Sequence, residues 1–135
     1  MANAQRVTYF KANLEDKPGT LLALANDLKS KNLGLAGLWG YGTSTGRGDV
    51  FVIPKNPDKL RNAWKQAGIL VEEGTAFFLK GTDKTGALIK SLEAIAQAGV
   101  NITAMNALAV GGKYGSVVWV PQADVQKTAQ ALGAK

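Results

Sequence analysis

The sequence predicts an α+β protein made of two copies of one β-α-β-β-α-β unit, with antiparallel sheets covered by helices on one face. The turn Asp16-Lys-Pro-Gly19 and the helical run Thr20–Lys31 are repeated 67 residues later as Asp83-Lys-Thr-Gly86 and Ala87–Ala98. The same offset joins further pairs in the helices, hairpins and strand ends: Leu21 with Leu88, Leu22 with Ile89, Leu28 with Ile95, Gly48 with Gly115, and Pro54 with Pro121. A period kept over this length indicates an internal duplication.

The first copy, residues 1–73, contains all six elements of the unit. Strands are predicted from β-branched and aromatic runs, and helices from apolar residues at helical spacing. The expected elements are the strand Val7–Ala12, the helix Thr20–Lys31, the strand Leu33–Thr43, a hairpin loop at Thr43–Gly48, the strand Asp49–Pro54, a helix from Pro57 to Gly68, and the strand Ile69–Glu73. Asp16 and Asn56 are predicted to cap the two helices, because both side chains accept hydrogen bonds from exposed helix amides.

The second copy, residues 75–135, repeats this order but stops one strand short. The expected elements are the strand Thr75–Lys80, the helix Ala87–Ala98, the strand Val100–Val110, the hairpin Gly111–Gly115, the strand Ser116–Val120, and a helix capped by Asp124 that runs to Leu132. In this ferredoxin-like plan the fourth strand covers the edge of the first. Without it the edge of Thr75–Lys80 stays open, which soluble proteins avoid. We therefore expect a homodimer that closes this edge.

Composition excludes several kinds of chemistry. The chain of 135 residues has neither Cys nor His, so no disulfide, thiolate nucleophile, histidine base or sulfur-bound metal is expected, and no cofactor is predicted. No signal peptide or membrane-spanning run is evident, and a cytoplasmic location is expected. The net charge of +6 is explained either by solubility, since the lysines are scattered, or by an anionic partner.

The two Asp-Lys-x-Gly turns, their Leu/Ile-striped helices and the segment Ala98-Gly-Val-Asn-Ile102 resemble the ACT domain. This resemblance covers nearly the whole chain as two tandem copies without a catalytic domain. It implies a regulatory, non-enzymatic protein that binds a small amino acid where two ACT units meet. It also implies a possible regulated enzyme partner.

By position, the resemblance assigns one ligand loop to each copy. In the second copy the implied site residues are Asp83, Thr85, Gly86 and, at the start of the next strand, Asn101. In the first copy they are Asp16, Pro18 and Gly19. Gly34 stands where the second copy has Asn101, so the second copy has the fuller set and is the expected site. A helix N-terminus suits the ligand carboxylate, while the Asp and Asn side chains suit its ammonium group.

Trp39 and Tyr41, in the glycine-rich strand of the first copy, are interpreted as packing residues rather than a ligand platform.

Two other functions remain open. A small enzyme would have to use carboxylate, Lys or Tyr groups, and no paired constellation of these is evident. A basic nucleic-acid-binding module of the same fold would use aromatic residues on the first and third strands, and six lie there: Tyr9, Phe10, Phe51, Phe77, Phe78 and Trp119. The third strands lack the Lys/Arg-Gly-Phe/Tyr consensus of RNA-binding sheets, so we do not expect nucleic acid.

Overall fold

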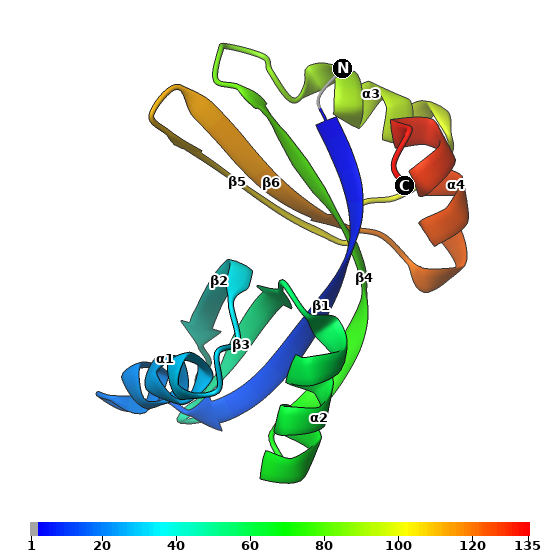
Figure 1. The fold of residues 1–135 in the computed structure, drawn as a ribbon. Coiled ribbons are helices and arrows are strands. Elements are labelled where there is room, and N and C mark those ends of the chain that lie inside the picture. Colours follow the sequence, from blue (N-terminus) through cyan, green and yellow to red (C-terminus); the bar gives the residue numbers. More distant parts are fainter. Residues whose placement is uncertain (1–2) are drawn as a thin grey trace. The chain divides into compact units, whose positions relative to one another are not determined.

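The computed structural model describes residues 3–135 and has the predicted α+β class (Figure 1). Its elements are β1 (Asn3–Glu15), α1 (Thr20–Ser30), β2 (Leu35–Gly42), β3 (Arg47–Pro54), α2 (Pro57–Ala67), β4 (Leu70–Thr82), α3 (Ile89–Gln97), β5 (Ala104–Val110), β6 (Lys113–Trp119), a short 3-10 helix η1 (Gln122–Asp124), and α4 (Val125–Leu132). Six strands form a sheet in the order β2-β3-β1-β4-β6-β5. No helix of the described chain is long and apolar enough to cross a membrane.

The chain forms two compact units, each with ferredoxin-like topology. The first unit is Thr8–Gly74, and the second unit combines residues 3–7 with Thr75–Lys135. Within the first unit the strand order is β2-β3-β1-β4, and within the second it is β1-β4-β6-β5. Each unit therefore has four strands and two helices, as the β-α-β-β-α-β plan requires.

Two long strands carry segments of both units. β1 and β4 each contain 13 residues, longer than the predicted strands Val7–Ala12, Ile69–Glu73 and Thr75–Lys80. β4 continues through Gly74 without a break, so the fourth strand of the first unit runs directly into the first strand of the second.

The expectation of an open edge on the second copy was wrong. β4 lies between β1 and β6, and residues 3–7 of β1 belong to the second unit. These residues occupy the place of the missing fourth strand: the Arg6 amide donates to the Lys135 carbonyl at 3.2 Å, and Ala4 packs on the core of the unit. Closing an open edge is therefore no longer a reason for a homodimer.

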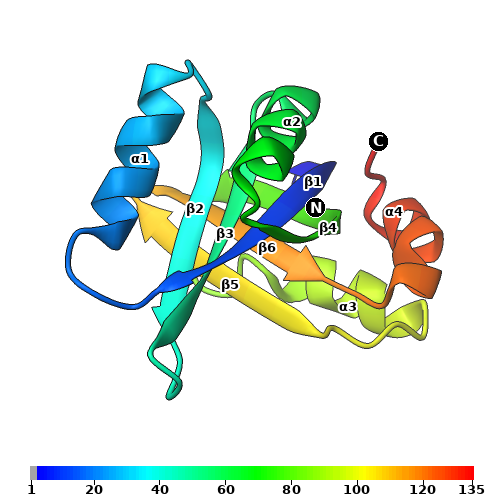
Figure 2. The same cartoon turned by 90° about the horizontal axis from the view of Figure 1, so that it is seen from below.

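The core of the first unit lies between its strands and both helices. It joins Phe10 of β1 and Val52 of β3 to Leu28 of α1 and to Trp64 of α2. Figure 2 shows α1 alongside β2. The predicted cap of α2 is confirmed, because the Asn56 side chain accepts a hydrogen bond from the Lys59 amide at 3.2 Å.

The second unit has an equivalent core. Phe77 and Leu79 of β4 pack with Ile95 of α3 and with Ala129 of α4. The cap predicted at Asp124 was wrong, because its side chain makes no capping hydrogen bond. α3 begins two residues later than predicted and ends one residue earlier, at Gln97.

The 67-residue correspondence does not extend through the third strands. In the first unit Leu14 pairs with Gly48. At an offset of 67, Gly81 corresponds to Leu14 and Gly115 to Gly48, but Gly81 pairs with Tyr114 instead. The cause is the hairpin. β5 and β6 turn through two residues in the left-handed region, Gly111 and Gly112, and the hairpin of the first unit is one residue longer. The predicted equivalences of Gly48 with Gly115 and of Pro54 with Pro121 are thus wrong by one residue.

Candidate functional site

The two repeated loops are tied to their units in the same way. The Asp16 amide donates to the Gly46 carbonyl at 3.0 Å, and the Asp83 amide donates to the Gly112 carbonyl at 2.9 Å. Each strand-to-helix loop is thereby held against the hairpin of its own unit. The side chain of Asp16 does not cap α1, in contrast to the prediction: the capping position is Gly19, in the left-handed region at φ 88°, with no side-chain bond.

In the first unit this loop borders an open groove of about 220 Å³. Polar groups come from the loop, the start of α1 and the strands, and apolar groups from the strands and α1. The lining residues are Leu14, Glu15, Asp16, Lys17, Thr20, Leu21, Gly40, Tyr41, Gly42, Gly48, Asp49 and Val50. Within this loop and the start of α1, Asp16 supplies a carboxylate, Lys17 an ammonium group and Thr20 a hydroxyl. The two residues between Lys17 and Thr20, Pro18 and Gly19, do not line the groove.

The carboxylate of Asp16 is positioned by a glycine. Its Oδ2 lies in the space that a Cβ atom on Gly42 would occupy. No hydrogen bond or ion pair engages this carboxylate in the described chain. Asp16 can therefore accept hydrogen bonds from a ligand without losing a partner inside the protein.

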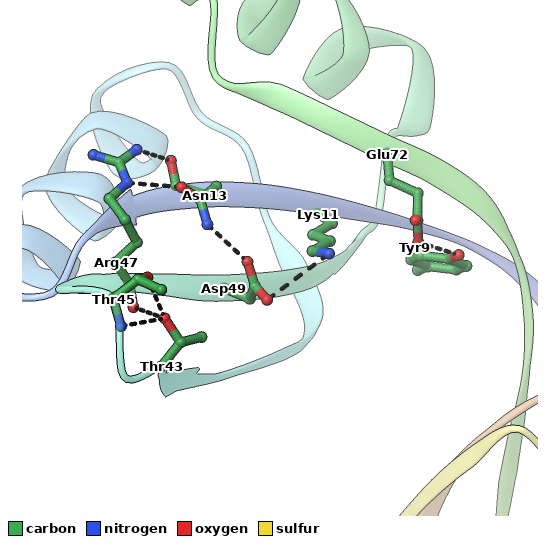
Figure 3. Close-up of polar contacts among 8 residues, drawn as sticks. All are labelled: Tyr9, Lys11, Asn13, Thr43, Thr45, Arg47, Asp49 and Glu72. Carbon is green, nitrogen blue, oxygen red and sulfur yellow. Dashed lines mark hydrogen bonds and ion pairs between the residues drawn. The ribbon is translucent and has the colours of Figure 1, made fainter.

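The neighbouring charges of the first unit are mostly satisfied internally (Figure 3). Arg47 donates from Nε to Asn13 Oδ1 at 2.7 Å, and Asn13 donates from Nδ2 to Asp49 Oδ1 at 2.9 Å. Lys11 Nζ lies 3.8 Å from Asp49 Oδ2. These contacts tie β1 to β3 beside the groove and take up the charge of Asp49.

Lys17 and Glu15, which both line the groove, form an ion pair at 2.8 Å. The hydrogen bond from Lys17 lowers the pKa of Glu15, and the same bond raises the pKa of Lys17. Both side chains are exposed, so the pair is weak and Lys17 is available to an anionic ligand.

The loop of the second unit borders a different groove, of about 330 Å³ and largely apolar. Asp83 and Gly86 line it together with Leu88, Leu108 and other residues of α3 and β5. Ala109 stands where the first unit has Gly42, so a methyl group fills the space equivalent to that taken by the Asp16 carboxylate.

The remaining residues of the predicted set lie elsewhere. Thr85 and Asn101 are not on the lining of the groove of the second unit. Asn101 follows α3 whereas Asp83 precedes it, so the nine residues of the helix, roughly 13 Å, separate the two ends. One amino acid cannot touch both residues within one unit.

Of the two aromatic residues predicted as packing groups, Trp39 packs on the neighbouring strand, whereas Tyr41 is 60% exposed and lines the groove. Trp39 stacks on Phe51 with centroids 5.7 Å apart and planes 4° apart, and Tyr41 lies 6.0 Å from Phe51. Phe10 and Phe77, counted in the nucleic-acid alternative, are fully buried in the two cores and unavailable for base stacking. This part of the nucleic-acid alternative was wrong.

Sequence reasoning missed Lys17, Thr20 and Gly42 as groove residues. Lys17 lies within the recognised motif and Thr20 directly follows it, so their position after Asp16 was a usable signal. Gly42 belongs to the glycine-rich strand predicted at Leu33–Thr43, where no local pattern distinguishes it. Its contact with Asp16 joins segments 26 residues apart and depends on the pairing of β2 with β3.

Comparison with known proteins identifies the fold. No family model and no curated protein matches the sequence. The protein BT0572 from Bacteroides thetaiotaomicron is similar in structure, with a TM-score of 0.82, 24% identity, and coverage of 98% of this chain and 90% of that chain. The ligand-free regulatory subunit of aspartate kinase from Thermus thermophilus gives a TM-score of 0.63 at 16% identity, with 98% and 94% covered.

A third structure is described as a putative C-terminal regulatory domain of aspartate kinase from Porphyromonas gingivalis. It gives a TM-score of 0.56 at 11% identity, with 98% and 94% covered. At these identities the likeness establishes the fold alone.

Proposed function

We propose that this chain is a non-enzymatic regulatory protein that binds a small amino acid in the groove beside Asp16 of the first unit. The observation that carries the proposal is the unpaired Asp16 carboxylate, held against Gly42 in the same groove as Lys17 and Thr20. Asp16 would accept hydrogen bonds from the ligand ammonium group. Lys17 and Thr20 would donate to its carboxylate, and the start of α1 favours that negative charge.

The size of the groove supports a ligand of this class. At about 220 Å³ it is smaller than the ~300–1,000 Å³ of pockets for drug-sized molecules. Leu14, Leu21 and Val50 supply an apolar wall for a short side chain. The few polar contacts, less the cost of immobilising the ligand, suggest binding in the micromolar to millimolar range, that is about −8 to −4 kcal/mol.

The fold likeness to regulatory parts of aspartate kinases supports a regulatory role. Under this proposal the ligand changes the association of the chain with a second copy or with a separate enzyme. The loop at Asp83, Thr85 and Gly86 is a second candidate site. There a second copy of the chain would have to supply the residue equivalent to Asn101, because Asn101 and Asp83 lie at opposite ends of α3.

A thermal-shift screen with the twenty amino acids tests the proposal, since a ligand that binds only the folded state raises Tm. We expect at least one amino acid to raise Tm. Asp16→Asn should abolish the shift, and Asp83→Asn should leave it intact. Asp27→Asn, which removes a carboxylate from α1 outside the groove, is the matched control. The absence of a shift with every amino acid would overturn the proposal, and loss of the shift only in Asp83→Asn would move the site to the second unit.

A further inference from the structure

The second unit contains a pocket of about 700 Å³ lined by four lysines. Lys80 comes from β4, Lys84 from the loop, Lys90 from α3, and Lys113 from β6. The other lining residues are Asn3, Gly81, Thr82, Gly86, Ala87 and Tyr114, and none is acidic. We propose that this pocket binds a small organic phosphate that carries two or more negative charges.

The four lysines have no compensating carboxylate. None of them takes part in a salt bridge or side-chain hydrogen bond in the described structure. The ion pair described in the second unit joins two other residues, Lys127 and Asp124, at 3.6 Å. Asp83, next to Lys84 in sequence, lines the neighbouring groove and not this pocket. Four like charges around one pocket repel one another, so a multivalent anion would relieve an unfavourable interaction as well as form new ones.

The first unit shows that the fold does not require this charge. The positions equivalent to Lys80, Lys84, Lys90 and Lys113 are Asn13, Lys17, Ala23 and Arg47. Of these, Lys17 is paired with Glu15 and Arg47 is bound to Asn13. The unpaired cluster is therefore a property of the second unit alone.

The backbone around the pocket also suits an anion. Gly86, in the left-handed region at φ 78°, leads into α3, whose first turn contains no acidic residue. A helix start without its own carboxylate favours negative charge from a ligand. Tyr114 is also on the lining, where its ring lies against Gly81, and its buried hydroxyl has no hydrogen-bond partner in the described structure. A phosphate oxygen would accept a bond from this hydroxyl after a small movement of the ring.

The shape of the site favours a small molecule over nucleic acid. A volume of about 700 Å³ falls in the range of ~300–1,000 Å³ typical of small-molecule sites. The four exposed lysines on its lining come from a strand pair, a loop and a helix. Single-stranded nucleic acid is bound instead along a groove that combines positive charge with exposed aromatic side chains. Tyr114, the aromatic residue on this lining, is buried.

Isothermal titration with ATP and with inorganic triphosphate tests the inference. We expect both to bind the full chain, and the double variant Lys84→Ala/Lys90→Ala to weaken binding by about 10-fold or more. The control Lys55→Ala/Lys65→Ala removes the same charge from the first unit, away from the pocket, and should bind as the parent does. Circular dichroism verifies that both variants are folded.

Three outcomes would overturn the inference: no heat with either phosphate at millimolar concentration, equal weakening in the two double variants, or short single-stranded RNA binding more tightly than ATP with the same dependence on Lys84 and Lys90. The result is independent of the proposed amino-acid site, because Asp16→Asn should leave phosphate binding unchanged.

Discussion

The carboxylate of Asp16 lies against Gly42, in space that any larger residue at position 42 would fill. Asp16 follows β1 and Gly42 ends β2, so a glycine on one strand sets the position of an acidic side chain in a loop. In the second unit the methyl group of Ala109 fills the corresponding space, so the Asp83 carboxylate cannot take the equivalent position. The two copies share a loop motif but differ in how they present its carboxylate.

Gly42→Ala should therefore displace the Asp16 carboxylate and weaken amino-acid binding by about 10-fold, the equivalent of ~1.4 kcal/mol. The fold should survive, because the group that must move is the end of a flexible side chain and Gly42 does not have a positive φ. The measurement is the ligand concentration that gives a half-maximal Tm shift.

The matched control for this change is Gly68→Ala. Gly68 ends α2 of the same unit, with open space around it but at φ 72°, so alanine there is strained outside the groove and away from the Asp16 loop. It should lower Tm and leave ligand affinity unchanged. Equal affinity losses in the two variants would show that Asp16 is not positioned by Gly42.

Ala4→Glu tests the assignment of residues 3–7 to the second unit. Ala4 packs on the core of this unit, so a charged side chain there is expected to lower the free energy of unfolding by about 2 kcal/mol or more. Urea denaturation measures the loss. Gln5→Glu, at the exposed neighbouring position, should change it by no more than about 0.5 kcal/mol. Equal effects at both positions would contradict the placement.

The raised pKa of Tyr9 predicts that the folded protein loses stability at alkaline pH. Burial, followed by its hydrogen bond to Glu72 at 2.7 Å, raises the pKa of the Tyr9 phenol from 10.0 to about 12. Above pH 10 the unfolded chain loses this proton while the folded chain keeps it, so the folded state binds more protons and stability falls as pH rises. The contribution is complete below pH 10 and disappears as pH passes about 12.

Absorbance of the phenolate measures this titration, with Tyr9→Phe identifying the signal of Tyr9. Glu72→Gln should move the Tyr9 pKa back toward 10, because the negative charge that opposes ionisation is removed. A Tyr9 transition at pH 10 in the parent protein would contradict the assigned hydrogen bond.

Much of the fold could be predicted from local sequence. The helices follow from leucine and isoleucine spacing, and the Asn56-Pro57 start of α2 follows from cap chemistry that involves neighbouring residues only. Gly111 and Gly112 specify a tight hairpin for the same reason.

The errors that bear on the site arose where distant segments meet, whereas the missed cap at Asp124 is a local one. Residues 3–6 (Asn-Ala-Gln-Arg) have little strand propensity and are extended because β4 lies beside them. The cap expected from Asp16 is absent because the capping position of α1 is Gly19, and the Asp16 carboxylate lies instead against Gly42, 26 positions away in the chain. The sequence showed the lysines of the pocket only as scattered positive charge. They are spread from position 80 to 113, and the fold brings them to the lining of one pocket.

The placement of residues 3–7 has a consequence for synthesis of the protein. The ribosome releases this strand before the first unit, whereas the rest of the unit that the strand completes is made after the first unit, from Thr75 onward. The first unit, Thr8–Gly74, can fold as soon as its own residues have left the ribosome. The second unit can fold only later, although its edge strand, residues 3–7, has been exposed since before the first unit was made. Dividing the polypeptide between Gly74 and Thr75 would therefore not give two halves that fold alone. The half that begins at Thr75 would lack the strand that covers the edge of its sheet.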